Sequence, residues 1–406
     1  MSEIPENLAR LIGPRKLDRS PVPRHLGWIT DAEGRIGLTK LSPTLLALPE
    51  LSEGPPGAPI CSYTDEGGRV EFRVSEIHRA DEDTPDPDLT WLTRREVLAQ
   101  YVDGEVMVDP ATRHALAPDG AGGESVAAGV RTFAVQSPTL PPATHTNCHL
   151  LESRTGSTHD DTHPLTEGTP ATRGLVVDPA STSPSGHAEL AERIDRWIGS
   201  VGPIEAIVLT HHHADHIGGA EALRERFGAP IWAHPATADR VPFAVDRLLN
   251  DGDYAGDWEV LFTPGHAPGH ICLWNAPRRL AVVGDMVASV GTIIVEPRDG
   301  DMAAYLSSLR RLLALDARVL YPAHGAPVTK ATEKLNHYIA HRLWREAAVL
   351  KALDDEPASL AVVRARAYPE IDPKISWLAD QSTHAHLIKL EQELRARHVG
   401  GLWTRV

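Results

Sequence analysis

Between residues 131 and 330, short apolar runs alternate with amphipathic stretches. The runs Gly174–Val177 and Glu205–Leu209 are typical of buried strands, and His187–Ile198 and Gly219–Phe227 have the spacing of helices that follow them. Strands alternating with helices predict a layered α/β domain whose helices lie outside the sheets. Further strands are expected at Pro230–Ala233, Glu259–Phe262, Ile271–Trp274, Leu280–Val283 and Val319–Tyr321, and a polar surface loop at Ser153–Arg173.

The flanking regions have different textures. Residues 1–130 mix Pro-rich loops with strand-like runs such as Val70–Val74, and Leu89–Leu116 predicts a Trp-containing strand, a short helix and a turn. We therefore expect an N-terminal α+β accessory domain in residues 1–130, a central domain in residues 131–330 and a third domain in residues 331–406.

The third region is predicted to be helical and to end in a hairpin. Further helices are expected at Leu360–Arg366 and Ser382–Arg397, with a hairpin over Gly400–Val406, an order that suggests a winged-helix-like module. The first helix is expected to bury an apolar stripe made by Leu335, Ile339, Leu343, Ala347 and Leu350.

Composition narrows the class of protein. The net charge of −15, from 40 Lys+Arg against 55 Asp+Glu, disfavours non-specific binding to phosphate backbones. Three widely spaced cysteines form neither a disulfide framework nor a CxxC knuckle. The first residues lack a signal peptide's apolar stretch, and no run approaches the ~20 apolar residues of a membrane span. We expect a cytoplasmic protein without a membrane partner.

The strongest chemical signal is Thr210–Gly219, THHHADHIGG, directly after the strand Glu205–Leu209. In an extended loop, His211 and His213 point to one side and His212 to the other. Asp215 and His216 follow where the chain turns toward a helix, so they can address a second metal. Imidazole and carboxylate ligands suit zinc, and also iron or manganese.

Three more segments place a metal-binding residue type after an apolar strand. TPGHAPGH offers His266 or His270, between which spacing does not choose; Asp285 follows VVG, and His324 lies in YPAHG. Taken singly, each is more typical of a cap or a hydrogen-bonded core residue. Their common position after strands instead predicts one shared site.

These four segments together resemble the metallo-β-lactamase superfamily over residues 131–330. The resemblance implies a four-layer αββα sandwich with its site at one edge and two Zn²⁺ per chain, Fe or Mn being alternatives. It selects His266 over His270, leaving His270 as a packed histidine, and makes His212 a structural residue that faces away. The implied ligands are His211, His213 and His266 for metal one, Asp215, His216 and His324 for metal two, and Asp285 as the bridge.

Three longer stretches carry the resemblance further. GTIIVEPRDGDMAAYLSSLRRLLALDARVLYPAHG and the tail pieces YIAHRLWREAAVLKAL and AHLIKLEQEL look like the β-lactamase-like protein 2 group. That group has a C-terminal winged-helix-like domain, and its members include single-strand endoribonucleases and enzymes that cleave acyl thioesters. DLTWLTRREVLAQYVDGEVMVDPATRHAL resembles the tail of Nudix-type domains, but residues 1–130 lack the REhxEE helix (h apolar), so a degenerate copy without a second active site is implied.

The resulting hypothesis is a dinuclear hydrolase in which a metal-bound hydroxide attacks an ester-like or acyl-thioester small molecule, with Asp215 orienting the nucleophile and accepting its proton. An endoribonuclease acting on phosphodiesters and a non-catalytic metal-binding scaffold remain as alternatives. Nucleic acid is not favoured as a partner, because basic and acidic residues are balanced in residues 331–406, and a homodimer is compatible with a winged helix used for packing. Tyr305 and Arg298 either line the substrate pocket or are an ordinary helix-face tyrosine and surface arginine, the second being favoured.

Overall fold

The computed structural model describes the backbone of eight strands between Arg24 and Val108, then residues 127–154 except 141, 142 and 144, residues 172–371 and residues 375–406. The eight strands form one mixed sheet in the order β5-β6-β1-β2-β3-β8, with β4 paired to β1 and β7 to β2. The predicted run Val70–Val74 lies in β6, and Trp91 lies in β7, whereas the short helix expected after it and most of the loop expected over Ser153–Arg173 fall outside the described residues. The bounds are β1 Arg24–Thr30, β2 Ile36–Ser42, β3 Leu45–Ala47, β4 Glu50–Leu51, β5 Ile60–Asp65, β6 Gly68–His78, β7 Leu89–Leu92 and β8 Met107–Val108.

The central region contains two further sheets. The first has six strands in the order β14-β13-β12-β11-β10-β9, antiparallel from β9 to β11 and parallel from β11 to β14. Its strands are β9 Val130–Val135, β10 Thr146–Arg154, β11 Thr172–Val177, β12 Ile204–Leu209, β13 Ile231–Ala233 and β14 Arg247–Leu248.

The second central sheet has five strands in the order β15-β16-β17-β18-β19, antiparallel except for the parallel pair β18–β19. Its strands are β15 Tyr254–Ala255, β16 Trp258–Phe262, β17 Ile271–Asn275, β18 Leu280–Gly284 and β19 Val319–Pro322. The strands expected from the apolar runs are therefore confirmed, with ends shifted by one or two residues.

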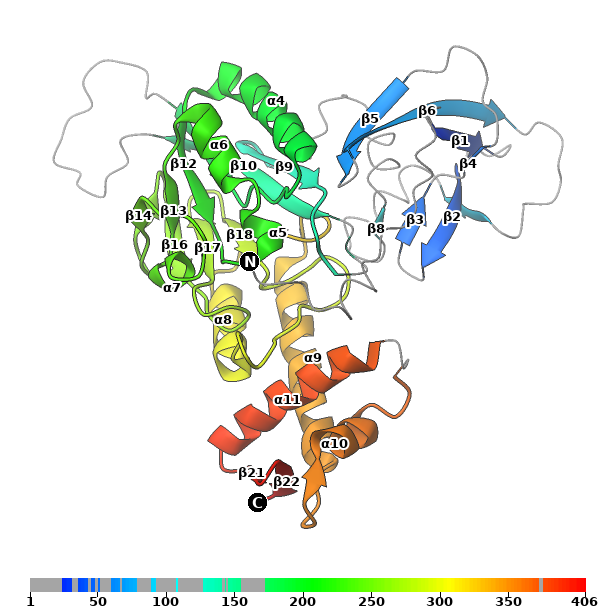
Figure 1. Cartoon of the computed structure of the whole chain (residues 1–406), viewed down its shortest axis with the longest axis vertical. Helices are drawn as coiled ribbons and strands as arrows, with labels where there is room; N and C mark the ends of the chain where they lie inside the picture. Colours follow the sequence, from blue (N-terminus) through cyan, green and yellow to red (C-terminus); the bar gives the residue numbers. More distant parts are fainter. Residues whose placement is uncertain are drawn as a thin grey trace.

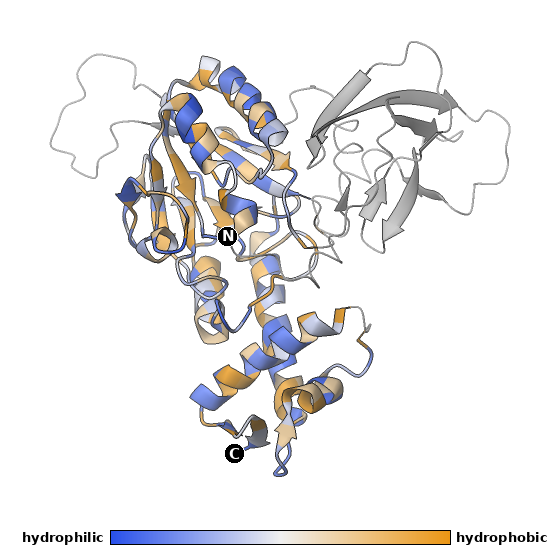
Figure 2. Ribbon diagram, viewed as in Figure 1, coloured by the Kyte–Doolittle hydropathy of each residue, from blue (hydrophilic) through white to orange (hydrophobic). Residues whose placement is uncertain are grey.

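Alternation along the apolar strands explains why the two sheets stack between helices. In β12, Ala206 and Val208 pack into the core between the sheets, whereas Ile207 and Leu209 pack under the helices on the outer face. Successive side chains of a strand point to opposite faces, so a strand covered on both sides is apolar throughout. The layers are thus helix, sheet, sheet and helix, and Figure 2 shows the apolar residues concentrated on the inner strands.

Helices cover the two outer faces (Figure 1). Leu190, Ile194 and Trp197 of α4 pack on the six-stranded sheet, and Leu306 and Leu309 of α8 pack on the five-stranded sheet. The expected helices at His187–Ile198 and Gly219–Phe227 are confirmed as α4 and α6. The helices of this domain are α4 Pro184–Val201, α5 Ala214–Ile217, α6 Ala220–Phe227, α7 Pro235–Ala238 and α8 Met302–Ala314.

The C-terminal region has the order helix, strand, two helices and a hairpin. Helix α9 runs from the central domain into this module, where α10 and α11 pack against it (Figure 1). A terminal hairpin is present, turned by Gly400 and Gly401, which both have positive φ. Its first strand covers residues 396–399, so the helix expected over Ser382–Arg397 begins earlier and ends at Gln392, and the hairpin begins before the predicted Gly400. The elements are α9 Ala331–Lys351, β20 Ala358–Ser359, α10 Leu360–Ala367, α11 Ser376–Gln392, β21 Ala396–Val399 and β22 Leu402–Arg405.

The buried face of α9 differs from the predicted stripe. Leu335 is buried as expected, but Leu343 is 41% exposed, and Arg342 and Glu346 are buried in its place. These two charged side chains can be buried because they pair with groups on other elements, which the apolar spacing of the helix does not reveal. The helix itself was predicted correctly, but the part of its buried face from Leu343 onward was not. No helix among the described residues combines the length and the apolar character that a membrane span needs.

Candidate metal centre

The seven side chains predicted as ligands lie at the ends of four strands and meet in one place. His211, His213, Asp215 and His216 follow β12, and α5 begins within that segment, so its turn brings the last two beside the first two. His266 follows β16, Asp285 follows β18, and His324 follows β19. Three overlapping sets of these residues place their ligand atoms within 4.8 Å of one another: His211–His213–His266, His211–His216–Asp285 and Asp215–His216–His324.

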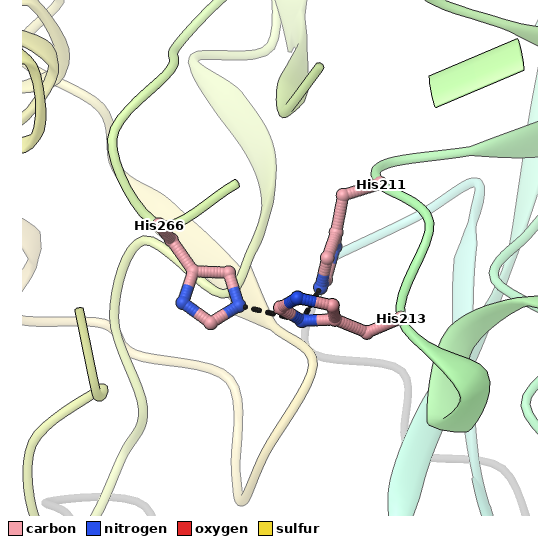
Figure 3. A group of neighbouring side chains, drawn as sticks. All are labelled: His211, His213 and His266. Carbon is pink, nitrogen blue, oxygen red and sulfur yellow. Dashed lines mark hydrogen bonds between the residues drawn. The ribbon is translucent and has the colours of Figure 1, made fainter. Parts of the chain in front are cut away.

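The first set consists of three imidazoles that face each other (Figure 3). His213 Nδ1 lies 2.9 Å from His211 Nε2 and 3.0 Å from His266 Nε2. The remaining nitrogen of each ring donates to an outside acceptor: His211 Nδ1 to Thr210 Oγ1 and His266 Nδ1 to the Ile294 carbonyl, at 2.8 Å. With those nitrogens protonated, three lone pairs converge, an arrangement that a cation between them would stabilise.

The remaining four ligands, His216, His324, Asp215 and Asp285, are called the second set and combine two imidazoles with two carboxylates. His216 Nε2 lies 3.8 Å from Asp215 Oδ2 and 3.7 Å from Asp285 Oδ1, and His324 Nε2 lies 3.3 Å from the same Asp285 oxygen. Asp285 Oδ2 is also 3.4 Å from His266 Nε2, so this carboxylate touches both sets. His216 is fully buried and the others are almost fully buried, with Asp215 the more open.

Asp178 is a functional residue that the sequence reasoning missed. It follows β11, and its Oδ1 accepts from the Thr210 backbone at 2.8 Å. Its Oδ2 accepts from Thr210 Oγ1 at 2.6 Å and from His216 Nδ1 at 2.9 Å. Asp178 thus fixes one histidine of each set, directly for His216 and through Thr210 for His211. An aspartate directly after an apolar strand was the available signal, the same one that identified Asp285.

Asp299, on the loop before α8, is a second missed residue. Its Oδ2 accepts from His213 Nε2 at 2.8 Å, which leaves His213 Nδ1 turned toward the other two rings. His212 Nε2 lies 3.4 Å from the same oxygen. The expectation that His212 faces away is therefore wrong: His212, His213 and Asp299 form a further group whose ligand atoms lie within 4.8 Å of one another. A loop carboxylate without a preceding strand carried no local signal.

His270 is a packed histidine, as the resemblance implied. It is fully buried, donates from Nδ1 to Thr263 Oγ1 at 2.9 Å, and accepts at Nε2 from the Asp285 backbone at 3.1 Å. Gly284 makes this contact sterically feasible, because a Cβ there would lie 2.7 Å from His270 Nε2 and 2.9 Å from Thr210 Oγ1. His270 therefore positions the Asp285 backbone.

The charges of the two sets differ. Burial, helped by neighbouring His216 and His213, holds the pKa of His211 well below its usual value, and burial lowers that of His266 to about 4, so both rings offer neutral nitrogens at pH 7. Burial acts in the same direction on His216, but Asp215, Asp178 and Asp285 outweigh it and raise its pKa. In the second set, the carboxylates therefore act on the pKa of His216 in the direction opposite to burial.

The donor set fits divalent cations by two observations. His216 Nε2 and Asp285 Oδ1 are buried, and neither has a hydrogen-bond partner within the described part of the chain. Buried polar atoms are normally paired, and a buried carboxylate is costly without compensation. Nitrogen and carboxylate donors of this kind suit zinc, iron or manganese.

Tyr305 and Arg298, the two further residues considered from sequence, lie outside the metal centre. Tyr305 is fully buried and donates to the Met286 carbonyl at 2.6 Å, and Arg298 is 81% exposed and pairs with Glu296, so the favoured interpretation is confirmed for both. His145 contributes its backbone carbonyl, which accepts from His324 Nδ1 at 3.1 Å.

Comparison with known proteins gives a consistent picture. Residues 169–324 match the family model described as the metallo-beta-lactamase superfamily. The beta-lactamase-like protein 2 homolog of Caenorhabditis elegans is 33% identical over 162 residues, covering 37% of this chain and 52% of the relative. The probable metallo-hydrolase YqjP of Bacillus subtilis is 26% identical over 269 residues, covering 54% of this chain and 84% of the relative.

A solved structure shares the fold. The beta-lactamase domain protein from Burkholderia ambifaria aligns with a TM-score of 0.59 at 23% identity, over 71% of this chain and 95% of that chain. The chain spans about half the length of the first curated relatives that it matches.

Proposed function

Because residues 169–324 form a metallo-beta-lactamase superfamily domain, the fold of a class of metallohydrolases, we propose that this chain is a two-metal hydrolase acting on an ester-like or acyl-thioester small molecule. The observation that carries the proposal is the convergence of ligand atoms from the ends of four strands, with His216 Nε2 and Asp285 Oδ1 buried and without a hydrogen bond to any described residue. Such a constellation is costly to bury unless it binds cations.

The residues divide between two cations, for which zinc suits the donors and iron or manganese are alternatives. His211, His213 and His266 would hold one, and His216, His324 and Asp215 the other, with Asp285 contacting both. When bound, the pair lowers the pKa of a water molecule toward neutrality and polarises the scissile group.

Asp215 is the residue of this chain that would accept a proton in the reaction. Its carboxylate is more exposed than the other ligands, and its Oδ2 accepts from Thr146 Oγ1 at 3.2 Å, which fixes its direction. In the proposed step a water oxygen bonds to the carbonyl carbon, Asp215 accepts the water's proton, the carbon–oxygen or carbon–sulfur bond breaks, and the proton held by Asp215 passes to the departing oxygen or sulfur. The products are a carboxylic acid and an alcohol or thiol.

The substrate class is argued from charge. A net charge of −15 repels a polyanion in bulk, which favours a small substrate. The order α9-β20-α10-α11-β21-β22 supports a winged-helix-like C-terminal module, and this keeps single-strand endoribonuclease activity as the second candidate. For residues 1–130 we propose an accessory, substrate-shaping role.

The test is a hydrolysis panel on metal-quantified protein, comparing acyl thioesters, lactones, β-lactams and single-stranded RNA. We expect thioester or ester cleavage that is lost on chelation and restored by zinc. Asp285→Ala should bind fewer than two metal ions and lose most activity, whereas Asp195→Ala, at the exposed ion pair with Arg226, should match the wild type. Cleavage of RNA alone would favour the second candidate, and full metal content and activity in Asp285→Ala would refute the scheme.

A further inference from the structure

The loop between β18 and α8 lies against both ligand sets through its backbone. It begins at Asp285, and near its middle the Ile294 carbonyl accepts from His266 Nδ1. In between, the Ser289 backbone donates to the His324 carbonyl at 3.0 Å, and Ser289 Oγ accepts from the Ala326 backbone at 3.0 Å. A shift of this loop would therefore move ligands of both sets.

One face of α9 holds the same loop. Lys334, Tyr338 and Arg342 are spaced by four residues, so their side chains lie on one side of the helix. Lys334 Nζ donates to the Ser289 carbonyl, and the Arg342 guanidinium donates to the Ile293 carbonyl. Between them the Tyr338 hydroxyl accepts from the Ala288 backbone at 2.8 Å and donates to the Gly291 carbonyl at 3.0 Å.

The burial of these side chains indicates a specific purpose. Tyr338 is fully buried and Arg342 is 3% exposed, in contact with the Tyr305 ring, whose own hydroxyl donates to the Met286 carbonyl of the loop. A buried guanidinium costs free energy unless it is well paired, so a leucine would serve better if packing alone mattered. Unlike an apolar residue, Arg342 and Tyr338 fix the position of the loop backbone through hydrogen bonds.

The far end of α9 is anchored in the C-terminal module. Glu346, one turn after Arg342, is 5% exposed, and its carboxylate lies 2.6 Å from Lys389 Nζ of α11 and 3.1 Å from Arg395. Figure 1 shows α9 crossing from α8 to α11. The helix is thus held at one end by the module and holds the loop at the other.

We propose that Lys334, Tyr338 and Arg342 of α9 are positioning residues of the metal centre, through which the C-terminal module sets the geometry of His266, Asp285 and His324. The proposal rests on the proposed two-metal function. Residues that orient metal ligands typically change metal affinity about 10- to 100-fold when substituted. The hydrogen bonds of the three residues described above reach the backbone of the loop and not the side chains of the ligands.

The test compares Tyr338→Phe with Tyr368→Phe. Each substitution removes one hydroxyl and keeps the ring; Tyr368 donates to Ser382 Oγ at 2.9 Å within the C-terminal module. Zinc affinity is measured by competition with a chromophoric chelator, and ligand geometry by the absorption bands of the cobalt-substituted protein. Tyr338→Phe should weaken zinc binding about 10-fold and change the cobalt bands, whereas Tyr368→Phe should change neither.

Arg342→Met and Lys334→Met should also weaken zinc binding and change the cobalt bands. If either variant fails to fold, the result for Tyr338→Phe decides whether the proposal stands. Wild-type zinc affinity and cobalt bands in Tyr338→Phe would overturn the proposal, as would equal losses in Tyr368→Phe. A wild type that binds two zinc ions tightly and hydrolyses nothing on the panel would refute the proposed function and leave the role of α9 standing.

Discussion

Oδ2 of Asp178 lies 2.9 Å from Nδ1 of His216, and this contact turns the other nitrogen of the ring toward Asp285. The same oxygen accepts from Thr210 Oγ1, which in turn accepts from His211. One carboxylate outside the ligand sets therefore selects the tautomer of a histidine in each set.

We predict that Asp178→Asn lowers the affinity for metal ions about 10- to 100-fold, because the amide presents a donor where Thr210 or His216 already donates. Isothermal titration of the metal-free protein with zinc measures the change. Asp380→Asn, which alters a partly buried pair with Arg364 in the C-terminal module, should bind zinc like the wild type. An unchanged affinity in Asp178→Asn would show that the His216 ring is oriented by its packing.

Gly174→Ala is predicted to destabilise the protein by about 1–3 kcal/mol through overpacking. A Cβ at Gly174 would lie 2.3 Å from a ring carbon of Trp197, which is 2% exposed and cannot easily move. Gly199→Ala, on the same helix as Trp197, meets nothing within 4 Å and should stabilise by about 0.5–1 kcal/mol. Urea unfolding measures both, and equal stability of the two variants would contradict the steric argument.

Acid should destabilise the protein partly through His386. Burial, together with Arg342 and Lys389, lowers the pKa of His386 to about 3, against about 6.5 in an unfolded chain. As pH falls below about 6.5, His386 binds a proton in the unfolded chain but not in the folded protein. The free energy of unfolding therefore decreases by up to about 1.4 kcal/mol per pH unit, until pH approaches the folded-state pKa of His386.

His386→Leu removes this contribution. In urea unfolding at a series of pH values, the free energy of unfolding of His386→Leu should fall less steeply between about pH 6 and pH 4 than that of the wild type. The same slope in both proteins would exclude His386 as a source of the acid sensitivity.

The sequence predicted the strands and their ligands because both have local signals. His211, Asp285 and His324 each follow an apolar run. Asp285 and His324 follow the parallel neighbours β18 and β19, and His211 follows β12 of the other sheet of the sandwich. Asp299 could not be found in this way, because its role depends on a contact with His213 from a distant loop. No pattern within a few residues encodes that distance.

The buried face of α9 shows a second limit. The spacing of Leu335, Ile339 and Leu343 predicts one stripe, yet burial follows Leu335, Tyr338 and Arg342. Periodicity scores Arg342 as exposed because it treats charge as a preference for water. The preference is reversed here by the Ile293 carbonyl and the Tyr305 ring, partners that only the tertiary structure supplies.

The parallel pairing of β19 with β18 sets the order in which the centre can be completed during translation. His324 is carried by a strand that pairs only after the α8 crossover, so a nascent chain paused after β18 presents Asp285 and His216 without their last imidazole partner. The loop after β18 is then still unheld, because α9 follows β19. In chain order, the group that contains His324 is therefore completed last, whereas His211, His213 and His266 all precede β18.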